Sequence, residues 1–152
     1  MLILNISYND PRVKRALEAE CGPPFGFWQG VRRGGVGSPR FELVDAPAAL
    51  LEAVDRPDDR GFCSLEMRPR GLVVRFRSRL ETLAVPAGWA PAPQVELGSP
   101  GAGLHAPLRL TLACGERLHF RLRREHWGTV NGLFRRLAPP GILKVTAASG
   151  LR

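Results

Sequence analysis

The feature that most limits how this chain can fold is a strict two-residue alternation of apolar and arginine side chains. It is clearest at residues 72–80, which read LVVRFRSRL. Because successive side chains of a β-strand point to opposite faces of its sheet, this run predicts a strand with one apolar face. Leu72, Val74, Phe76 and Leu80 share that face, and Val73, Arg75, Arg77 and Arg79 share the other.

A second run with the same rhythm predicts a hairpin nearer the C-terminus. Residues 108–114 and 117–123 are joined across Cys114-Gly115-Glu116, a short turn that contains glycine. The side chains expected to point inward are Leu108, Leu110, Leu112, Leu118, Phe120 and Leu122; those expected outward are Arg109, His119, Arg121 and Arg123. Cys114 shares the parity of Leu112, so it is expected in the core.

Shorter patterns predict the remaining elements. Further strands are expected at residues 2–8, 41–44, 62–68, 81–86 and 94–97, and helices at residues 11–20, 46–54 and 125–137. In the last helix Trp127, Val130, Phe134 and Leu137 fall on one apolar stripe. Pro139-Pro140 ends that helix, and residues 138–152 are predicted to form a tail in which 142–145 is the one candidate strand.

Residues 21–39 are rich in glycine and proline and contain three neighbouring aromatic residues, Phe25, Phe27 and Trp28. Aromatic side chains in a loop usually bury their large apolar surface. We therefore expect these three to hold the loop against the core. The alternative is a platform on which a ligand stacks.

These elements predict an α+β fold, with a bent antiparallel sheet or partly open barrel, a C-terminal packing helix and an N-terminal helix-containing extension. A chain of 152 residues has the length of one domain and can build a sizeable core without disulfides. We predict a single domain over residues 1–152, with a strand-helix extension at 1–55 and the barrel with its helix at 62–137. The polar stretch DRPDDRG at 55–61 is the best candidate boundary.

The cysteines and the chain start favour a cytoplasmic protein. Cys21, Cys63 and Cys114 are far apart and odd in number, which fits free thiols in a reducing compartment. Residues 1–8 lack both the basic region and the cleavage site of a secretion signal. No segment approaches the roughly 20 apolar residues of a membrane span.

No catalytic, cofactor-binding or metal-ligating residue is predicted. Residues 101–106 match the dinucleotide fingerprint G-x-G-x-x-A, but they follow Ser99-Pro100 and lead into Pro107 instead of opening a helix. The three histidines and three cysteines show no metal-ligand spacing. The sequence therefore predicts a protein that is not an enzyme; an enzyme whose site assembles from distant residues is the least favoured alternative.

The final hairpin has the form L-x-L-x-L-x-C-G-E-x-L-x-F-x-L and is followed by one amphipathic helix. With the preceding hairpins, this pattern at about residues 62–137 resembles a bacterial pleckstrin-homology-like (PH-like) domain. The resemblance implies a bent antiparallel barrel that the C-terminal helix plugs at one end. That family has seven strands and six are predicted after Phe62, so the seventh would come from residues 41–44 or 2–8.

The resemblance also bears on ligands. Some members of the family bind phosphoinositides through basic residues on the first hairpin, often with R-x-R on its second strand. Arg75-Phe76-Arg77 matches that pattern, but the turn at residues 68–71 is too short to wrap a headgroup.

The net charge of +8 favours polyanionic partners, although a basic surface that only keeps the protein in solution is the competing interpretation. The residues predicted to bind a partner or an anionic surface are Arg68, Arg70, Arg75, Arg77, Arg79, Arg109, Arg121 and Arg123. The leading hypothesis is a non-enzymatic binding or scaffold module that engages a protein or an anionic membrane surface through this basic sheet face. The alternative is a nucleic-acid-associated regulator. Self-association through an exposed strand edge is a further expectation.

Overall fold

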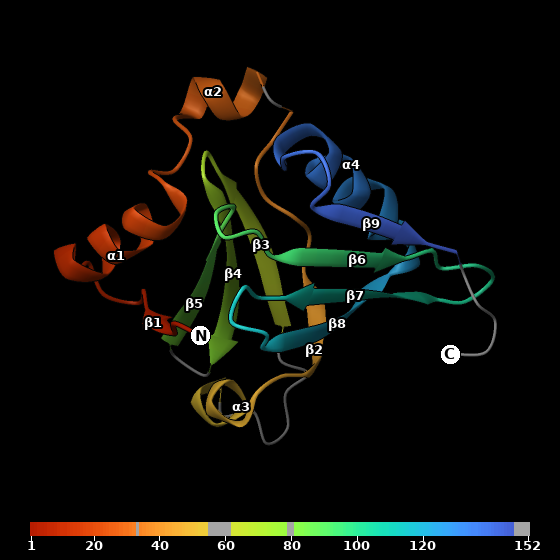
Figure 1. The fold of residues 1–152 in the computed structure, drawn as a ribbon, viewed down its shortest axis with the longest axis horizontal. Helices are drawn as coiled ribbons and strands as arrows, with labels where there is room; N and C mark the ends of the chain where they lie inside the picture. Colours follow the sequence, from red (N-terminus) through yellow and green to blue (C-terminus); the bar gives the residue numbers. More distant parts are fainter. Residues whose placement is uncertain (33, 55–61, 79–80, 148–152) are drawn as a thin grey trace.

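The computed structural model describes residues 1–32, 34–54, 62–78 and 81–147 and shows the predicted α+β fold (Figure 1). In this described part, nine strands form one mostly antiparallel open sheet in the order β1-β5-β4-β3-β2-β8-β7-β6-β9. The strands are β1 (Leu4–Asn5), β2 (Phe41–Asp45), β3 (Phe62–Arg68), β4 (Gly71–Ser78), β5 (Glu81–Gly88), β6 (Gln94–Gly98), β7 (His105–Thr111), β8 (Arg117–Arg123) and β9 (Leu143–Thr146). The helices are α1 (Pro11–Cys21), α2 (Phe27–Arg32), α3 (Ala48–Val54) and α4 (Trp127–Leu137), with a 3-10 turn η1 (Arg124–His126) before α4.

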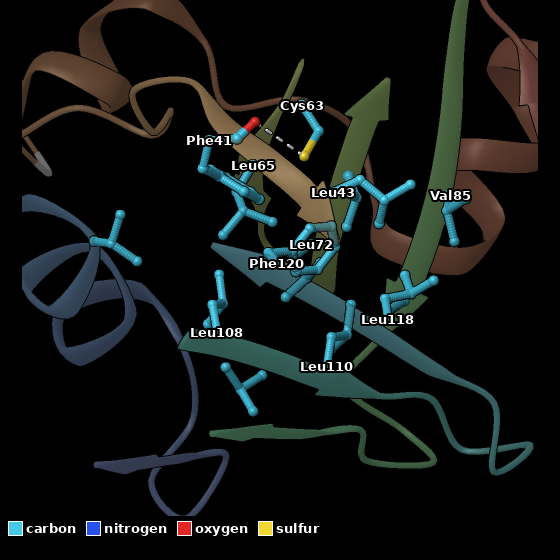
Figure 2. Packing of buried hydrophobic residues seen from close by; sticks show 14 of the residues in the cluster. Phe41, Leu43, Cys63, Leu65, Leu72, Val85, Leu108, Leu110, Leu118 and Phe120 are labelled. Atoms are coloured by element: carbon cyan, nitrogen blue, oxygen red, sulfur yellow. Dashed lines mark hydrogen bonds between the residues drawn. The ribbon is translucent and has the colours of Figure 1, made fainter. Parts of the chain in front are cut away.

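The sheet bends around its own core. Figure 1 shows β3, β4 and β5 running across the direction of β6 and β7, with β2 and β8 adjacent where the two halves meet. Figure 2 shows apolar side chains from both halves meeting inside the bend, among them Leu72 and Val85 from one half and Leu108 and Leu110 from the other. Phe120 joins the halves, because its ring packs edge-on against Phe41 at 5.0 Å between centroids. Within the described residues the alternation therefore encodes the inner core as predicted, and Leu80 lies outside them.

The C-terminal helix packs on this core. Val130 and Phe134 of the predicted stripe are buried, Trp127 and Leu137 are half-buried, and Leu133 joins them. The indole Nε1 of Trp127 donates a hydrogen bond of 2.9 Å to the carbonyl oxygen of Gly98. The predicted packing helix is confirmed, although it begins as the turn η1.

Helix α1 packs against the opposite, outer face of β4 and β5. Asp10 caps its N-terminus by accepting a hydrogen bond of 2.9 Å from the backbone N–H of Arg12. Leu17 and Cys21 are buried against Val73 and Ala84, with Leu4 and Ile6 beside them. This explains why Val73 is buried although it shares its face with arginines.

Two glycines allow that approach. Gly71 of β4 pairs with Gly88 of β5 directly beneath the end of α1. A Cβ on Gly88 would lie 2.5 Å from the carbonyl oxygen of Glu20, and one on Gly71 would lie 2.8 Å from Cys21 Sγ. Only a residue without a side chain fits at these two positions.

Several boundaries differ from the predictions. Strand β1 is shorter than residues 2–8, and β7 begins at His105, so that Pro107 lies inside a strand opposite Arg121. Proline cannot donate to a β-ladder, and for that reason the sequence favours a loop there. Strand β9, at the predicted candidate within the tail, pairs in parallel with β6. The boundary at residues 55–61 lies outside the described residues.

Two packing predictions are wrong. Phe27 and Trp28 are 76% and 74% exposed, so they do not hold their loop against the core. Cys114 is exposed, because it follows the end of β7 and lies in the turn.

Candidate anion-binding face

A depression of about 400 Å³ opens on the sheet beside β3, β4 and β5. Three arginines, two hydroxyls and an exposed aromatic ring line it: Arg40, Arg75, Arg77, Ser64, Thr82 and Phe62, together with the buried pair Cys63 and Phe76. The strand register explains this convergence. Ser64 lies opposite Arg75, and Arg77 lies opposite Thr82, so the four residues occupy neighbouring positions on one outward face.

The depression carries positive charge without a carboxylate among its described lining residues. Arg40 and Arg77 are exposed. Arg75 is partly buried and pairs with Glu66, which accepts from its Nε at 3.1 Å and also from its Nη2. A guanidinium offers several N–H donors in a fixed plane and suits phosphate or carboxylate oxygens. The arrangement can therefore hold an anion with arginines at its rim and hydroxyl donors beside them.

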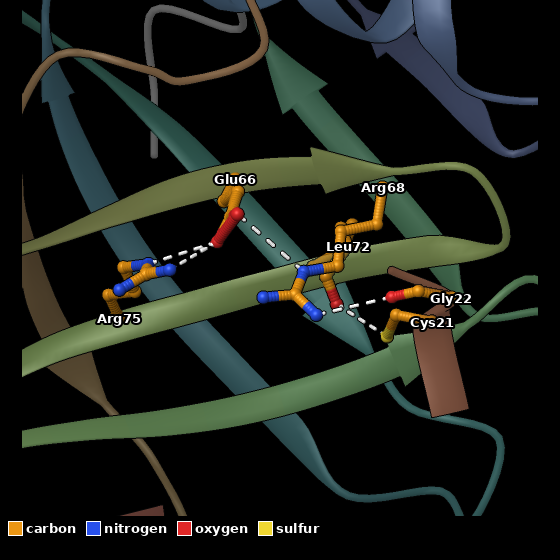
Figure 3. A network of polar contacts seen from close by, with 6 residues as sticks. All are labelled: Cys21, Gly22, Glu66, Arg68, Leu72 and Arg75. Atoms are coloured by element: carbon orange, nitrogen blue, oxygen red, sulfur yellow. Dashed lines mark hydrogen bonds and ion pairs between the residues drawn. The ribbon is translucent and has the colours of Figure 1, made fainter. Parts of the chain in front are cut away.

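Figure 3 shows that the same Glu66 also faces Arg68. Arg68 is only 5% exposed, which removes it from any surface available to a partner. Its Nη1 donates to the carbonyl oxygen of Gly22 at 3.1 Å, and its Nε lies 3.6 Å from Glu66 Oε1. Arg68 therefore ties β3 to the end of α1. The alternation of Arg68 with apolar residues predicts exposure, because the sequence pattern of β3 does not show that α1 will cover this end of its outer face.

Arg70 is exposed, but it too contacts α1. Its Nη2 donates a hydrogen bond of 2.9 Å to the carbonyl oxygen of Glu18, and its backbone N–H donates to Cys21 at 2.8 Å. The turn between β3 and β4 is thus a docking point for α1. Arg79 lies outside the described residues.

The arginines of the other half lie close to acidic groups. Arg121 forms an ion pair with Glu42 of β2, and Arg123 Nε lies 3.1 Å from Glu125. Arg109 lies opposite Glu96 on one side and His119 on the other. None of these three arginines lines the depression.

The structure therefore brings together two of the predicted residues, Arg75 and Arg77, and adds a third arginine. Arg40 precedes β2 and follows Ser38-Pro39, so no alternation marks it in the sequence. Ser64 and Thr82 share the outward parity of their predicted strands, but only the register reveals that they face the arginines. Phe62 begins β3 and is 39% exposed.

Other kinds of site find no support in the described residues. Within residues 1–32, 34–54, 62–78 and 81–147, no group of three or more His, Cys, Asp or Glu side chains is placed to hold a metal ion. No helix in this part of the chain is long and apolar enough to cross a membrane. Comparisons with models of protein families, with curated proteins and with solved structures gave no match to this chain.

Proposed function

We propose that this protein is a non-enzymatic binding module that holds an anionic group of a protein partner in the depression beside β3, β4 and β5. The observation that carries the proposal is the convergence of Arg40, Arg75 and Arg77 with two hydroxyls on one concave surface. The partner's group is a carboxylate or phosphate, because these anions match guanidinium and hydroxyl donors.

The paired state of Arg75 supports this assignment. Its bond to Glu66, which also lies near Arg68, fixes the guanidinium beside the depression. Arg77 and Arg40 are exposed and so are accessible to an incoming anion. A partly fixed arginine beside two accessible ones loses less side-chain freedom on binding than three mobile ones would.

We further propose that residues 41–137 form a PH-like barrel. In the described sheet β2 lies between β3 and β8. With β2 as the seventh strand, β2 to β8 supply the seven strands of that family. Helix α4 follows and packs on the bent sheet, as that resemblance implies. Helix α3, inserted between β2 and β3, departs from the pattern, as do the elements before β2 and strand β9.

The test is retention on heparin, with a matched loss of charge elsewhere as control. The double variant Arg40→Ser, Arg77→Ser should elute at clearly lower salt than the wild type, because it removes both accessible guanidiniums. The control Arg109→Ser, Arg117→Ser loses the same charge from exposed positions on β7 and β8. Equal elution of the two variants would mean that heparin senses only net charge and that the depression binds nothing specifically.

A nucleic-acid partner is the second candidate, and the exposure of Phe62 favours it. Aromatic side chains beside basic grooves stack on bases of single strands. Titration of a single-stranded oligonucleotide at two salt concentrations tests this alternative. Binding that weakens about tenfold or more in Phe62→Ala would replace the protein partner with nucleic acid; no binding at low salt removes the alternative.

Self-association through a sheet edge stays a prediction. The edges of the described sheet are β1 and β9, with two and four residues. Short edges, and the exposed Lys144 on β9, are features that discourage edge-to-edge pairing. A cytoplasmic location also stays a prediction.

A further inference from the structure

Helix α2 carries the most exposed pair of aromatic side chains in the described part of the chain. Phe27 and Trp28 are 76% and 74% exposed, and their rings contact each other edge-on at 5.1 Å between centroids. The other two aromatic pairs, Phe41–Phe120 and Phe76–Phe120, are buried in the core. Two exposed rings in contact form a small apolar patch, and exposed apolar patches often mark a binding site.

The chain segment that carries this pair is basic. The sequence from residue 22 to residue 40 contains no Asp or Glu, while Arg32 is exposed in the last turn of α2. Helix α4, far away in the sequence, supplies further arginines. The guanidinium of Arg136 lies against Gly34, where any Cβ would collide with it, and Arg135 is exposed beside it in the last turn of α4. The segment that carries the aromatic pair is therefore basic, and at Gly34 it lies against an arginine of α4.

We propose that α2 is an anchor that inserts Phe27 and Trp28 into the interface of an anionic lipid bilayer. Aromatic rings favour the headgroup level of a membrane, where apolar ring surface and polar surroundings meet. Arginines close to a bilayer surface attract anionic headgroups and strengthen the attachment. An exposed ring pair on a basic segment complements this surface in both polarity and charge.

The position of α2 in the fold fits such an anchor. Figure 1 shows α2 and α3 at opposite ends of β3, β4 and β5. The depression lies toward the α3 end, since Ser78 at the end of β4 bonds the carbonyl oxygens of Ala53 and Val54 in α3. Attachment through α2 leaves the depression directed away from the bilayer. The anchor thus does not rest on the proposed function, and the two sites can act together.

The experiment is sedimentation with vesicles of phosphatidylcholine containing 30% phosphatidylglycerol, compared with vesicles of phosphatidylcholine alone. The wild type should bind the anionic vesicles about tenfold or more tightly than the neutral ones. Phe27→Ala, Trp28→Ala should lower that affinity about tenfold or more, because the inserted rings are gone. Arg32→Ser should lower it about fivefold.

Two controls isolate the anchor. Leu104→Ala removes another highly exposed apolar side chain, 79% exposed, and should change binding less than about twofold. Arg109→Ser, Arg117→Ser removes two charges from exposed positions on β7 and β8 and should change vesicle binding by no more than the same twofold. Because the rings of α2 are exposed, the thermal unfolding of Phe27→Ala, Trp28→Ala should match that of the wild type.

Tryptophan emission gives a second readout. Trp28 is exposed, whereas Trp89 and Trp127 are half-buried. Anionic vesicles should shift wild-type emission to shorter wavelength and leave the emission of Trp28→Ala unchanged. The proposal is overturned by equal binding to both kinds of vesicle, by full binding of Phe27→Ala, Trp28→Ala, or by a wild-type dimer that this double variant abolishes.

Discussion

The inner core and the outer layer of this protein are held by different means. The inner core lies inside the bend of the sheet, is apolar and draws side chains from β2 to β8, α3 and α4. The outer layer lies between α1 and strands β4 and β5, and among the described residues its buried apolar members are Leu17, Cys21, Val73 and Ala84. Arg68 supplements them by donating to the backbone at the end of α1.

The comparison shows that the outward face of a single strand, β4, has three different surroundings along its length. Toward its start, the outward face of β4 buries Val73 under α1. In its middle, Arg75 pairs with Glu66, and near its end Arg77 is exposed at the depression. The inner face carries Leu72, Val74 and Phe76, all buried, so it has one purpose throughout.

The largest expected effect is in the inner core. Phe134→Ala should destabilise the protein by about 3–5 kcal/mol, because it removes a fully buried ring beneath α4 and leaves a cavity. Chemical denaturation followed by far-UV circular dichroism measures the loss. Trp28→Ala, in an exposed ring, should stay within about 0.5 kcal/mol. Similar losses in the two variants would contradict the description of α4 as packed on the core.

A smaller loss is expected in the outer layer. Leu17→Ala should cost about 2–3 kcal/mol, near the lower end for buried leucines, because its small cluster can partly collapse. Hydrogen exchange should show faster exchange in α1 and little change in β7 and β8. Uniformly faster exchange over both regions would show that the two layers unfold only together.

The glycine pair offers a sharper test of how α1 is seated. Gly88→Ala should displace the end of α1, since the new Cβ would meet the carbonyl oxygen of Glu20. We expect a loss of about 1–3 kcal/mol, typical of overpacking. The control is Gly128→Ala, which adds a Cβ in open space and should be neutral or stabilising. Gly115 is unsuitable as a control because its φ of +93° would strain any other residue. Equal effects of Gly88→Ala and Gly128→Ala would refute the close approach.

Arg68→Met should cost about 1–2 kcal/mol, because it leaves the carbonyl oxygen of Gly22 without its donor. Glu66 keeps Arg75 as a partner, so its carboxylate is not left alone. Arg75→Met should cost less, about 1 kcal/mol or below, because that arginine is more exposed and its ion pair is screened by solvent. A larger loss of stability for Arg75→Met than for Arg68→Met would contradict the expectation that the more buried arginine contributes more.

Thiol labelling perturbs the protein least, because the native cysteines report how accessible the two layers are. Burial raises the pKa of the Cys21 thiol to about 11. At pH 8 about one molecule in a thousand therefore carries the reactive thiolate there. Cys114 should react first, Cys21 when α1 detaches, and Cys63 in the inner core last. Labelling of Cys21 should become faster in Leu17→Ala; Cys63 reacting before Cys21 would contradict the layered order.

Much of the fold was predictable because its elements carry local signals. Strand β8 and β3 have the predicted bounds, and α1 begins at the predicted proline. The inward parity of Leu108, Leu110, Leu118 and Phe120 is confirmed by their burial. The candidate site was predictable only in part. Arg75 and Arg77 follow from alternation, whereas Arg40 comes from a loop whose place beside Ser64 depends on the register between distant segments.

The sequence by itself determined which side chains point together along each strand, because the two-residue period is a property of the extended backbone. Tertiary structure alone decided what each face meets. The seating of α1 on Gly71 and Gly88 turned Val73 and Arg68 into buried residues, while Phe27 and Trp28 stayed exposed. These outcomes depend on packing between segments far apart in the chain, and no local pattern encodes which distant surface will cover a given residue.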